Sequence, residues 1–63
     1  MMNALEKLGW KWYKNEYGWI SFFDKQRRMS IHIPSKKVRI ECEPTFDEIL
    51  ALAEVIKEME NTK

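Results

Sequence analysis

The stretch of sequence that decides the fold is RMSIHIPSKKVRIECE, residues 28–43. Apolar and polar residues alternate along each half of it, and Pro34 separates the two halves. A period of two is typical of β-strands with one buried and one solvated face. The stretch therefore predicts two half-buried strands, at residues 28–34 and 37–43.

Two further strand-like runs precede it, at residues 10–15 and 18–24. The gaps between successive runs hold turn-forming residues such as Asn, Asp, Gly, Pro and Ser. These gaps are too short for the crossover helices that parallel strands require. We therefore expect the four runs to form an antiparallel meander.

Short turns set the expected registers of the later strands. A two-residue turn at residues 25–26 gives two pairs on the apolar face, Phe22 with Met29 and Ile20 with Ile31. On the other face it gives three pairs, Phe23 with Arg28, Ser21 with Ser30 and Trp19 with His32. A two-residue turn at residues 35–36 gives three pairs on the apolar face, Ile33 with Val38, Ile31 with Ile40 and Met29 with Cys42. On the other face it gives His32 with Arg39, Ser30 with Glu41 and Arg28 with Glu43. Both turns agree on which face is apolar.

The first hairpin has two candidate registers. A three-residue turn at residues 16–18, with Gly18 left-handed, places Trp10 and Trp12 on the apolar face. A two-residue turn places Lys11 and Tyr13 there instead, because a slip of one residue turns every side chain to the opposite face. We favour the three-residue turn, since burying two tryptophans is more favourable than burying a lysine.

Helices are predicted at both ends of the chain. Asn3 and Glu6 form a capping box for a short helix over residues 3–8, which Gly9 ends. Thr45 and Glu48 form a second capping box, for a helix from Phe46 to about Asn61. The whole of residues 1–63 is thus expected to be one small α+β domain: a four-stranded antiparallel β-meander with the C-terminal helix packed on one face and a short N-terminal helix.

The C-terminal helix carries two adjacent apolar stripes, wider together than one sheet contact requires. We expect the first stripe to pack on the sheet, and it consists of Phe46, Ile49, Leu50, Ala53 and Ile56. The second stripe consists of Leu52, Val55 and Met59. It packs either on Leu5 and Leu8 of the first helix, which we favour, or on a second copy of the chain as a homodimer seam.

Composition limits the classes of function. The chain has 63 residues, net charge +1 and a single cysteine, so it has no internal disulfide. Nine Lys and Arg stand against three acidic residues in residues 1–40, and two Lys against seven acidic residues in residues 41–63. No apolar run approaches the ~20 residues of a membrane span, and the first residues do not form a secretory signal. We therefore expect a cytoplasmic protein with no membrane association.

Groups for catalysis or metal binding are scarce. One His and one Cys cannot build a zinc site within one chain. The two glycines do not form a phosphate-binding loop. Cys42 alternates with Val38 and Ile40, which predicts a buried and unreactive thiol. We expect no cofactor, no metal and no enzymatic activity.

The most informative surface is the polar face of the predicted sheet, here named the outer face. It consists of Lys11, Tyr13, Trp19, Ser21, Phe23, Arg28, Ser30, His32, Lys37 and Arg39. One long helix covers one face of the sheet and leaves these side chains exposed. The candidate binding residues on this face are Tyr13, Trp19, Phe23, Arg28, His32 and Arg39.

Three explanations account for aromatic rings exposed together. Aromatic and Arg side chains are the usual anchors of protein interfaces, and a protein partner is the interpretation we favour. A single-stranded nucleic acid is the alternative, because bases stack on aromatic rings while basic groups hold phosphates. Glu41 and Glu43 on the same expected face weigh against it. In the third interpretation, the stems of Arg28 and Arg39 cover the rings and the face is merely solvated.

The layout of the chain resembles small phage and prophage proteins of Gram-positive bacteria. The features that carry the resemblance are a helix ending in Leu8-Gly9-Trp10, a short meander and an acidic helix from Thr45 to Glu60. The resemblance implies a phage or mobile-element accessory protein that binds a host protein. It carries no specific motif, so it implies no functional residues.

Overall fold

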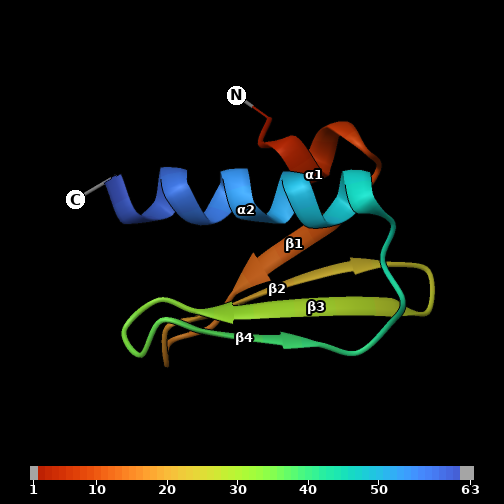
Figure 1. Ribbon diagram of the computed structural model, residues 1–63. Helices are drawn as coiled ribbons and strands as arrows, with labels where there is room; N and C mark the ends of the chain where they lie inside the picture. The colour runs from red at the N-terminus through yellow and green to blue at the C-terminus, as the bar shows by residue number, and fades with distance from the viewer. Residues whose placement is uncertain (1, 62–63) are drawn as a thin grey trace.

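The short connections between strands place each strand beside the next, and the sheet has the order β1-β2-β3-β4 with every neighbouring pair antiparallel. The structure is a computed structural model, and it is described here for residues 2–61. Both helices lie on the same side of the sheet (Figure 1). The elements are α1 (Ala4–Lys7), β1 (Lys11–Lys14), β2 (Trp19–Asp24), β3 (Arg27–His32), β4 (Lys37–Ile40) and α2 (Phe46–Asn61). This confirms the α+β prediction.

The first two hairpins have the expected registers. Trp12 lies opposite Phe22 in the first, and Phe22 lies opposite Met29 in the second. The amide N–H of Asn15 donates to the carbonyl of Trp19, which closes the three-residue turn, and Gly18 has a φ of 91°. The predicted left-handed glycine therefore fixes the face that β1 presents to the core.

The third hairpin departs from the predicted register by two residues. Val38 lies opposite Ile31, not Ile33, and Arg39 lies opposite Ser30. The prediction is wrong because a four-residue turn spans residues 33–36: the amide of Lys36 donates to the carbonyl of Ile33, and Lys36 has a φ of 58°. Pro34 follows Ile33 in this turn, where its fixed φ is favourable and its missing N–H costs nothing. A shift of two residues leaves the apolar face unchanged.

Both predicted capping boxes are present. The side chain of Asn3 accepts from the Glu6 amide, and the Glu6 carboxylate accepts from the Asn3 amide, both at 2.8 Å. In α2 the Thr45 amide donates to Glu48 at 2.8 Å, and the Glu48 amide donates to the Thr45 hydroxyl at 3.2 Å. Each box satisfies amide groups that a helix leaves without partners at its start.

The second stripe of α2 is buried beside α1, as we favoured, whereas of the first stripe, which we expected to pack on the sheet, only Ile56 packs against the core. Leu52 and Val55 of the second stripe are buried, whereas Phe46 and Leu50 of the first stripe are 89% and 67% exposed. The helix is turned about its axis because α1 packs along it, and Leu5 lies fully buried in the cluster that contains Leu52 and Val55.

The homodimer seam predicted at Leu52, Val55 and Met59 is therefore wrong. Leu52 and Val55 belong to the core of the single chain, and Met59 is half-buried against that core. Leu5 is the partner on α1, as expected, but Leu8 remains exposed. A short helix of four residues offers only one inward side chain of this size, and Leu5 occupies that position.

The core joins the inner face of the central strands to the two helices. Its buried members are Leu5, Trp10, Ile20, Phe22, Met29, Ile31, Ala51, Leu52 and Val55. Trp10 is 2% exposed, as predicted, but Trp12 is 38% exposed although it shares the inner face with Phe22. Trp12 lies in an edge strand, so its indole covers the Phe22 ring from one side, with the ring centroids 6.4 Å apart.

Candidate outer-face binding site

The outer face lies on the side of the sheet away from α1 and α2 (Figure 1). Strand alternation and the observed registers arrange its side chains in rows across the sheet. Tyr13, Ser21, Ser30 and Arg39 form the middle row. The flanking rows contain Lys11, Phe23 and Arg28 on one side, and Trp19, His32 and Lys37 on the other.

Two serines occupy the centre of the outer face. The hydroxyl oxygens of Ser21 and Ser30 lie 3.3 Å apart and share a hydrogen bond. Both residues are buried, although no helix covers them. Larger neighbours therefore extend over them, and the small serines leave room for these side chains to cross the sheet.

The Arg39 side chain extends across the sheet toward Trp19. It is paired with Ser30 on β3, yet its guanidinium carbon lies 5.4 Å from the centre of the Trp19 ring on β2. The His32 ring lies 4.8 Å from the Trp19 ring, measured between centroids. Trp19 is thus held by a cation and by a second ring, a geometry in which cation–π attraction restricts its side chain.

Tyr13 and Phe23 form the second aromatic pair. Their ring centroids lie 6.0 Å apart at an interplanar angle of 56°. This tilted geometry is one that aromatic rings prefer. Tyr13 is exposed, while Phe23 and Trp19 are half-buried. We expected all three rings to be exposed. Only the Tyr13 ring is, and the rings of Trp19 and Phe23 are partly covered.

His32 also ties two turns to the end of the sheet. Its Nε2 atom lies 3.0 Å from the carbonyl oxygen of Tyr17, which only accepts, so Nε2 carries the proton. Its Nδ1 atom accepts from the hydroxyl and the amide of Ser35. The imidazole thus has partners on both nitrogens and acts as a fixed part of the site.

The charge of the outer face is positive. Its strand positions carry Lys11, Arg28, Lys37 and Arg39, and none of these positions carries an acid. The register of the third hairpin brings Arg39, in place of Glu41, opposite Ser30. Glu41 lies just beyond β4, where its amide donates to the carbonyl of Arg28 at 3.0 Å.

The structure thus brings five of the six candidate residues into two groups. Trp19, His32 and Arg39 make one group, and Tyr13 and Phe23 make the other. Arg28 is exposed and lies opposite Phe23. The predicted covering of a ring by an arginine is therefore present for Arg39 over Trp19.

A second polar cluster, on the inner face, was not anticipated from the sequence. Arg27 contacts Asp24 at 2.6 Å and Glu48 at 2.8 Å, and its guanidinium carbon lies 5.0 Å from the centre of the Trp10 ring. The indole N–H of Trp10 donates to Glu48 at 3.2 Å. The sequence did contain a sign of this cluster, because strand alternation places the charged residues Asp24 and Arg27 on the apolar face beside Trp10.

The cluster keeps Glu48 ionised. The backbone hydrogen bond from Thr45 is the main cause that lowers the pKa of Glu48, and bonds from Arg27 and Trp10 act in the same direction. Burial opposes them. The pKa of Arg27 is raised by the hydrogen bonds that Arg27 makes to two carboxylates, first to Asp24 and then to Glu48. All four side chains hold one another, so the cluster joins the β2–β3 hairpin to the start of α2.

The potential metal ligands among residues 2–61 are His32, Cys42 and the acidic side chains. Within this range no group of three or more His, Cys, Asp and Glu side chains is placed to hold a metal ion. Cys42 is half-buried and packs against the core. No helix in the same range is long and apolar enough to cross a membrane.

Comparison of the chain with protein-family models, with curated proteins and with solved structures finds no significant match.

Proposed function

We propose that the outer face binds another protein and that the chain acts without catalysing a reaction. The observation that carries this proposal is the fixed position of Trp19, which contacts both His32 and Arg39, on a face that neither helix covers. Trp, Tyr and Arg are the residues most enriched among interface anchors. Anchors already held in place lose little side-chain entropy on binding, so they favour affinity.

The charge of the outer face defines the partner that suits it. The face carries Lys11, Arg28, Lys37 and Arg39, whereas α2 on the opposite side exposes Asp47 and Glu54. A partner with acidic groups around an apolar centre would be attracted to the outer face and repelled by α2. We therefore infer an acidic protein surface as the partner.

A single-stranded nucleic acid is the second candidate function. The observation that favours it is the position of Arg39 in the middle row, with Glu41 at the corner. A phosphate chain crossing the face would meet basic groups, and its bases could stack on Tyr13 or Phe23. The covering of Trp19 by Arg39 weighs against this candidate, because a stacked base needs an open ring face.

The resemblance to small phage and prophage proteins supports a narrower form of the proposal. In that form the partner is a host protein, and the chain is a phage or mobile-element accessory protein acting in the cytoplasm. The single cysteine agrees with a reducing compartment.

A capture experiment with two tryptophan variants tests the proposal. Trp19→Ala removes the ring at the centre of the site, and Trp12→Ala removes a partly exposed ring from the inner face. We expect the wild type and Trp12→Ala to retain a discrete, nuclease-resistant partner from a host lysate, and Trp19→Ala to lose it. Equal capture by Trp19→Ala, with an unchanged circular dichroism spectrum, would contradict the proposal.

The salt dependence of binding separates the two candidate functions. For a single-stranded nucleic acid, Arg28→Ala should lower the slope of log affinity against log salt by ~0.7, which is the effect of one lost phosphate contact. For a protein partner, the slope should be shallow and Trp19→Ala should weaken binding mainly through faster dissociation. A labelled oligonucleotide and the captured protein are the two probes.

A further inference from the structure

The inner face of β4 is not covered by the helix that packs on the rest of the sheet. Val38 and Ile40 point to the inner face but are 48% and 42% exposed. Ile49 lies seven residues before Ile56, on the same flank of α2, and is also exposed. Apolar side chains of this kind gathered at one margin of a sheet mark an interaction surface.

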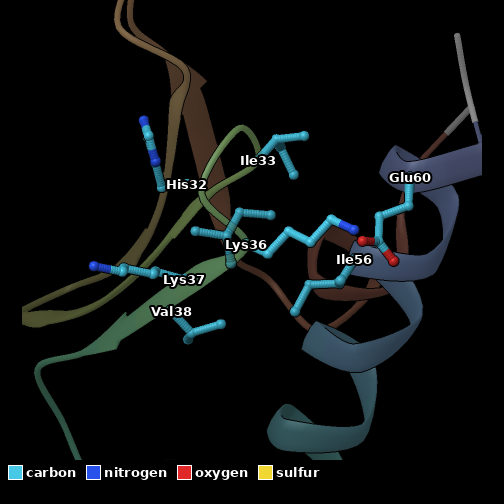
Figure 2. Close-up of a pocket in the computed structure, with 8 residues that line it drawn as sticks. His32, Ile33, Lys36, Lys37, Val38, Ile56 and Glu60 are labelled. Atoms are coloured by element: carbon cyan, nitrogen blue, oxygen red, sulfur yellow. The ribbon is translucent and has the colours of Figure 1, made fainter.

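A hollow of about 220 Å³ opens between β4 and α2 at this margin. Val38 lines it from the strand and Ile56 from the helix, while Lys36 and Glu60 point toward each other across its mouth (Figure 2). His32 and Lys37, which also border it, point to the outer face (Figure 2). The hollow therefore belongs to the inner side and is distinct from the outer-face site.

The free edge of β4 is ready for strand pairing. β4 is the last strand of the sheet, and the Glu41 amide points toward β3, since it donates to Arg28. In an antiparallel ladder, backbone groups of alternate residues point to the same neighbour. Val38 and Ile40 therefore direct their N–H and C=O groups outward, away from β3.

The charges along this edge complement those of a second copy of the same edge. They are Lys37 and Arg39 before Ile40, and Glu41 and Glu43 after it. An antiparallel pairing centred on Ile40 places Arg39 opposite Glu41 of the second copy, twice. A shift by one register step places Arg39 opposite Arg39, or Glu41 opposite Glu41, and like charges directly opposite are unfavourable.

We propose that two copies of this chain pair antiparallel about a two-fold axis at Ile40, with β4 of each copy opposite residues 40–43 of the other. The two sheets then continue into one another, and both α2 helices lie on the same side of it. The exposed flanks of the two helices face each other above Val38 and Ile40 of both copies. The Arg39–Glu41 pairs of this dimer lie at the β4 margin of the outer face, and Tyr13, Trp19 and Phe23 stay uncovered, so the dimer does not depend on the proposed function.

A charge exchange across the axis tests the pairing. Glu41→Arg places Arg39 opposite an arginine, and Arg39→Glu places Glu41 opposite a glutamate, so each variant alone should run as one chain in sedimentation equilibrium. An equal mixture of the two variants should recover the mass of two chains, because every opposed pair is then of opposite charge. Glu54→Arg makes the same charge change at an exposed α2 position outside the proposed interface and should remain dimeric like the wild type.

The expected change for Glu41→Arg is at least about a tenfold rise in the dimer dissociation constant, from two opposed like-charge pairs. Circular dichroism establishes that each variant is folded. A wild type that stays a single chain up to millimolar concentration overturns the proposal. A wild-type dimer that Glu41→Arg leaves intact also overturns it, because the contact then lies elsewhere. Trp19→Ala should not change the mass, which separates this outcome from a failure of the outer-face proposal.

Discussion

The indole N–H of Trp10 donates to the Oε2 atom of Glu48 at 3.2 Å, and this bond joins residues 38 positions apart in the sequence. Arg27 binds the same carboxylate and lies over the Trp10 ring. One buried acid thus connects the start of β1, the β2–β3 hairpin and the first turn of α2. The free energy of unfolding should therefore depend on the charge of Glu48.

Glu48→Gln should make the free energy of unfolding smaller and less dependent on pH. The pKa of Glu48 is lowered from 4.5 in the folded chain. Its contribution is therefore fully present above about pH 4.5 and is lost as pH falls through the lower, folded pKa. We expect a loss of about 1–3 kcal/mol at pH 7, since charged hydrogen bonds are weakened. Urea unfolding at pH 7 and pH 3 measures both effects, and an equal loss at both pH values would contradict the assignment.

Ile31→Ala should destabilise the protein by about 2–4 kcal/mol, because it opens a cavity beneath α2 where the side chain is 1% exposed. Leu8→Ala removes an exposed apolar side chain and should change the stability by about 0.5 kcal/mol or less. Chemical denaturation compares the two variants. Equal stabilities would mean that the inner face of the sheet is assigned to the wrong side.

Leu52→Lys should unfold the chain, because it places a charge in the core against Leu5. Leu50→Lys, two residues earlier, should leave the circular dichroism spectrum and the melting temperature nearly unchanged, because Leu50 is exposed. This pair tests the direction in which α2 faces. The reverse result would restore the predicted packing of the first stripe on the sheet.

Gly18→Ala should be more costly than Gly9→Ala. Both glycines have positive φ, so each substitution carries roughly 1–2 kcal/mol of backbone strain. A Cβ atom at Gly18 would also lie 2.9 Å from two ring carbons of Pro34, whereas one at Gly9 meets open space. Melting temperatures rank the two variants, and an equal loss would show that the Pro34 ring moves aside without cost.

The positions of helices and strands could be predicted from the sequence because local interactions determine them. The capping boxes at Asn3 and Thr45 each involve residues three positions apart, and the alternation around Ile31 assigns side chains to faces without reference to the rest of the chain. Gly18 similarly selects the turn that sets the face of β1. These features depend on backbone geometry within a few residues.

The outer face could be predicted as a set of residues for the same reason. A register error of two residues, as at Pro34, moves every pairing but no side chain to the other face. The neighbours within the face could not be predicted. Arg39 lies opposite Ser30, and not opposite His32 as predicted, and reaches Trp19 from that position.

The sequence by itself determined the order of elements, the apolar side of each strand and the two helix starts. Only the tertiary structure decided which flank of α2 is buried, because the apolar arc of the helix is wider than one contact and either flank satisfies its local pattern. Leu5 packs in one cluster with Leu52 and Val55, so the flank that carries these two residues is buried and Phe46 and Leu50 are exposed. Rotation of a helix about its axis depends on the sum of distant contacts, which no local pattern contains.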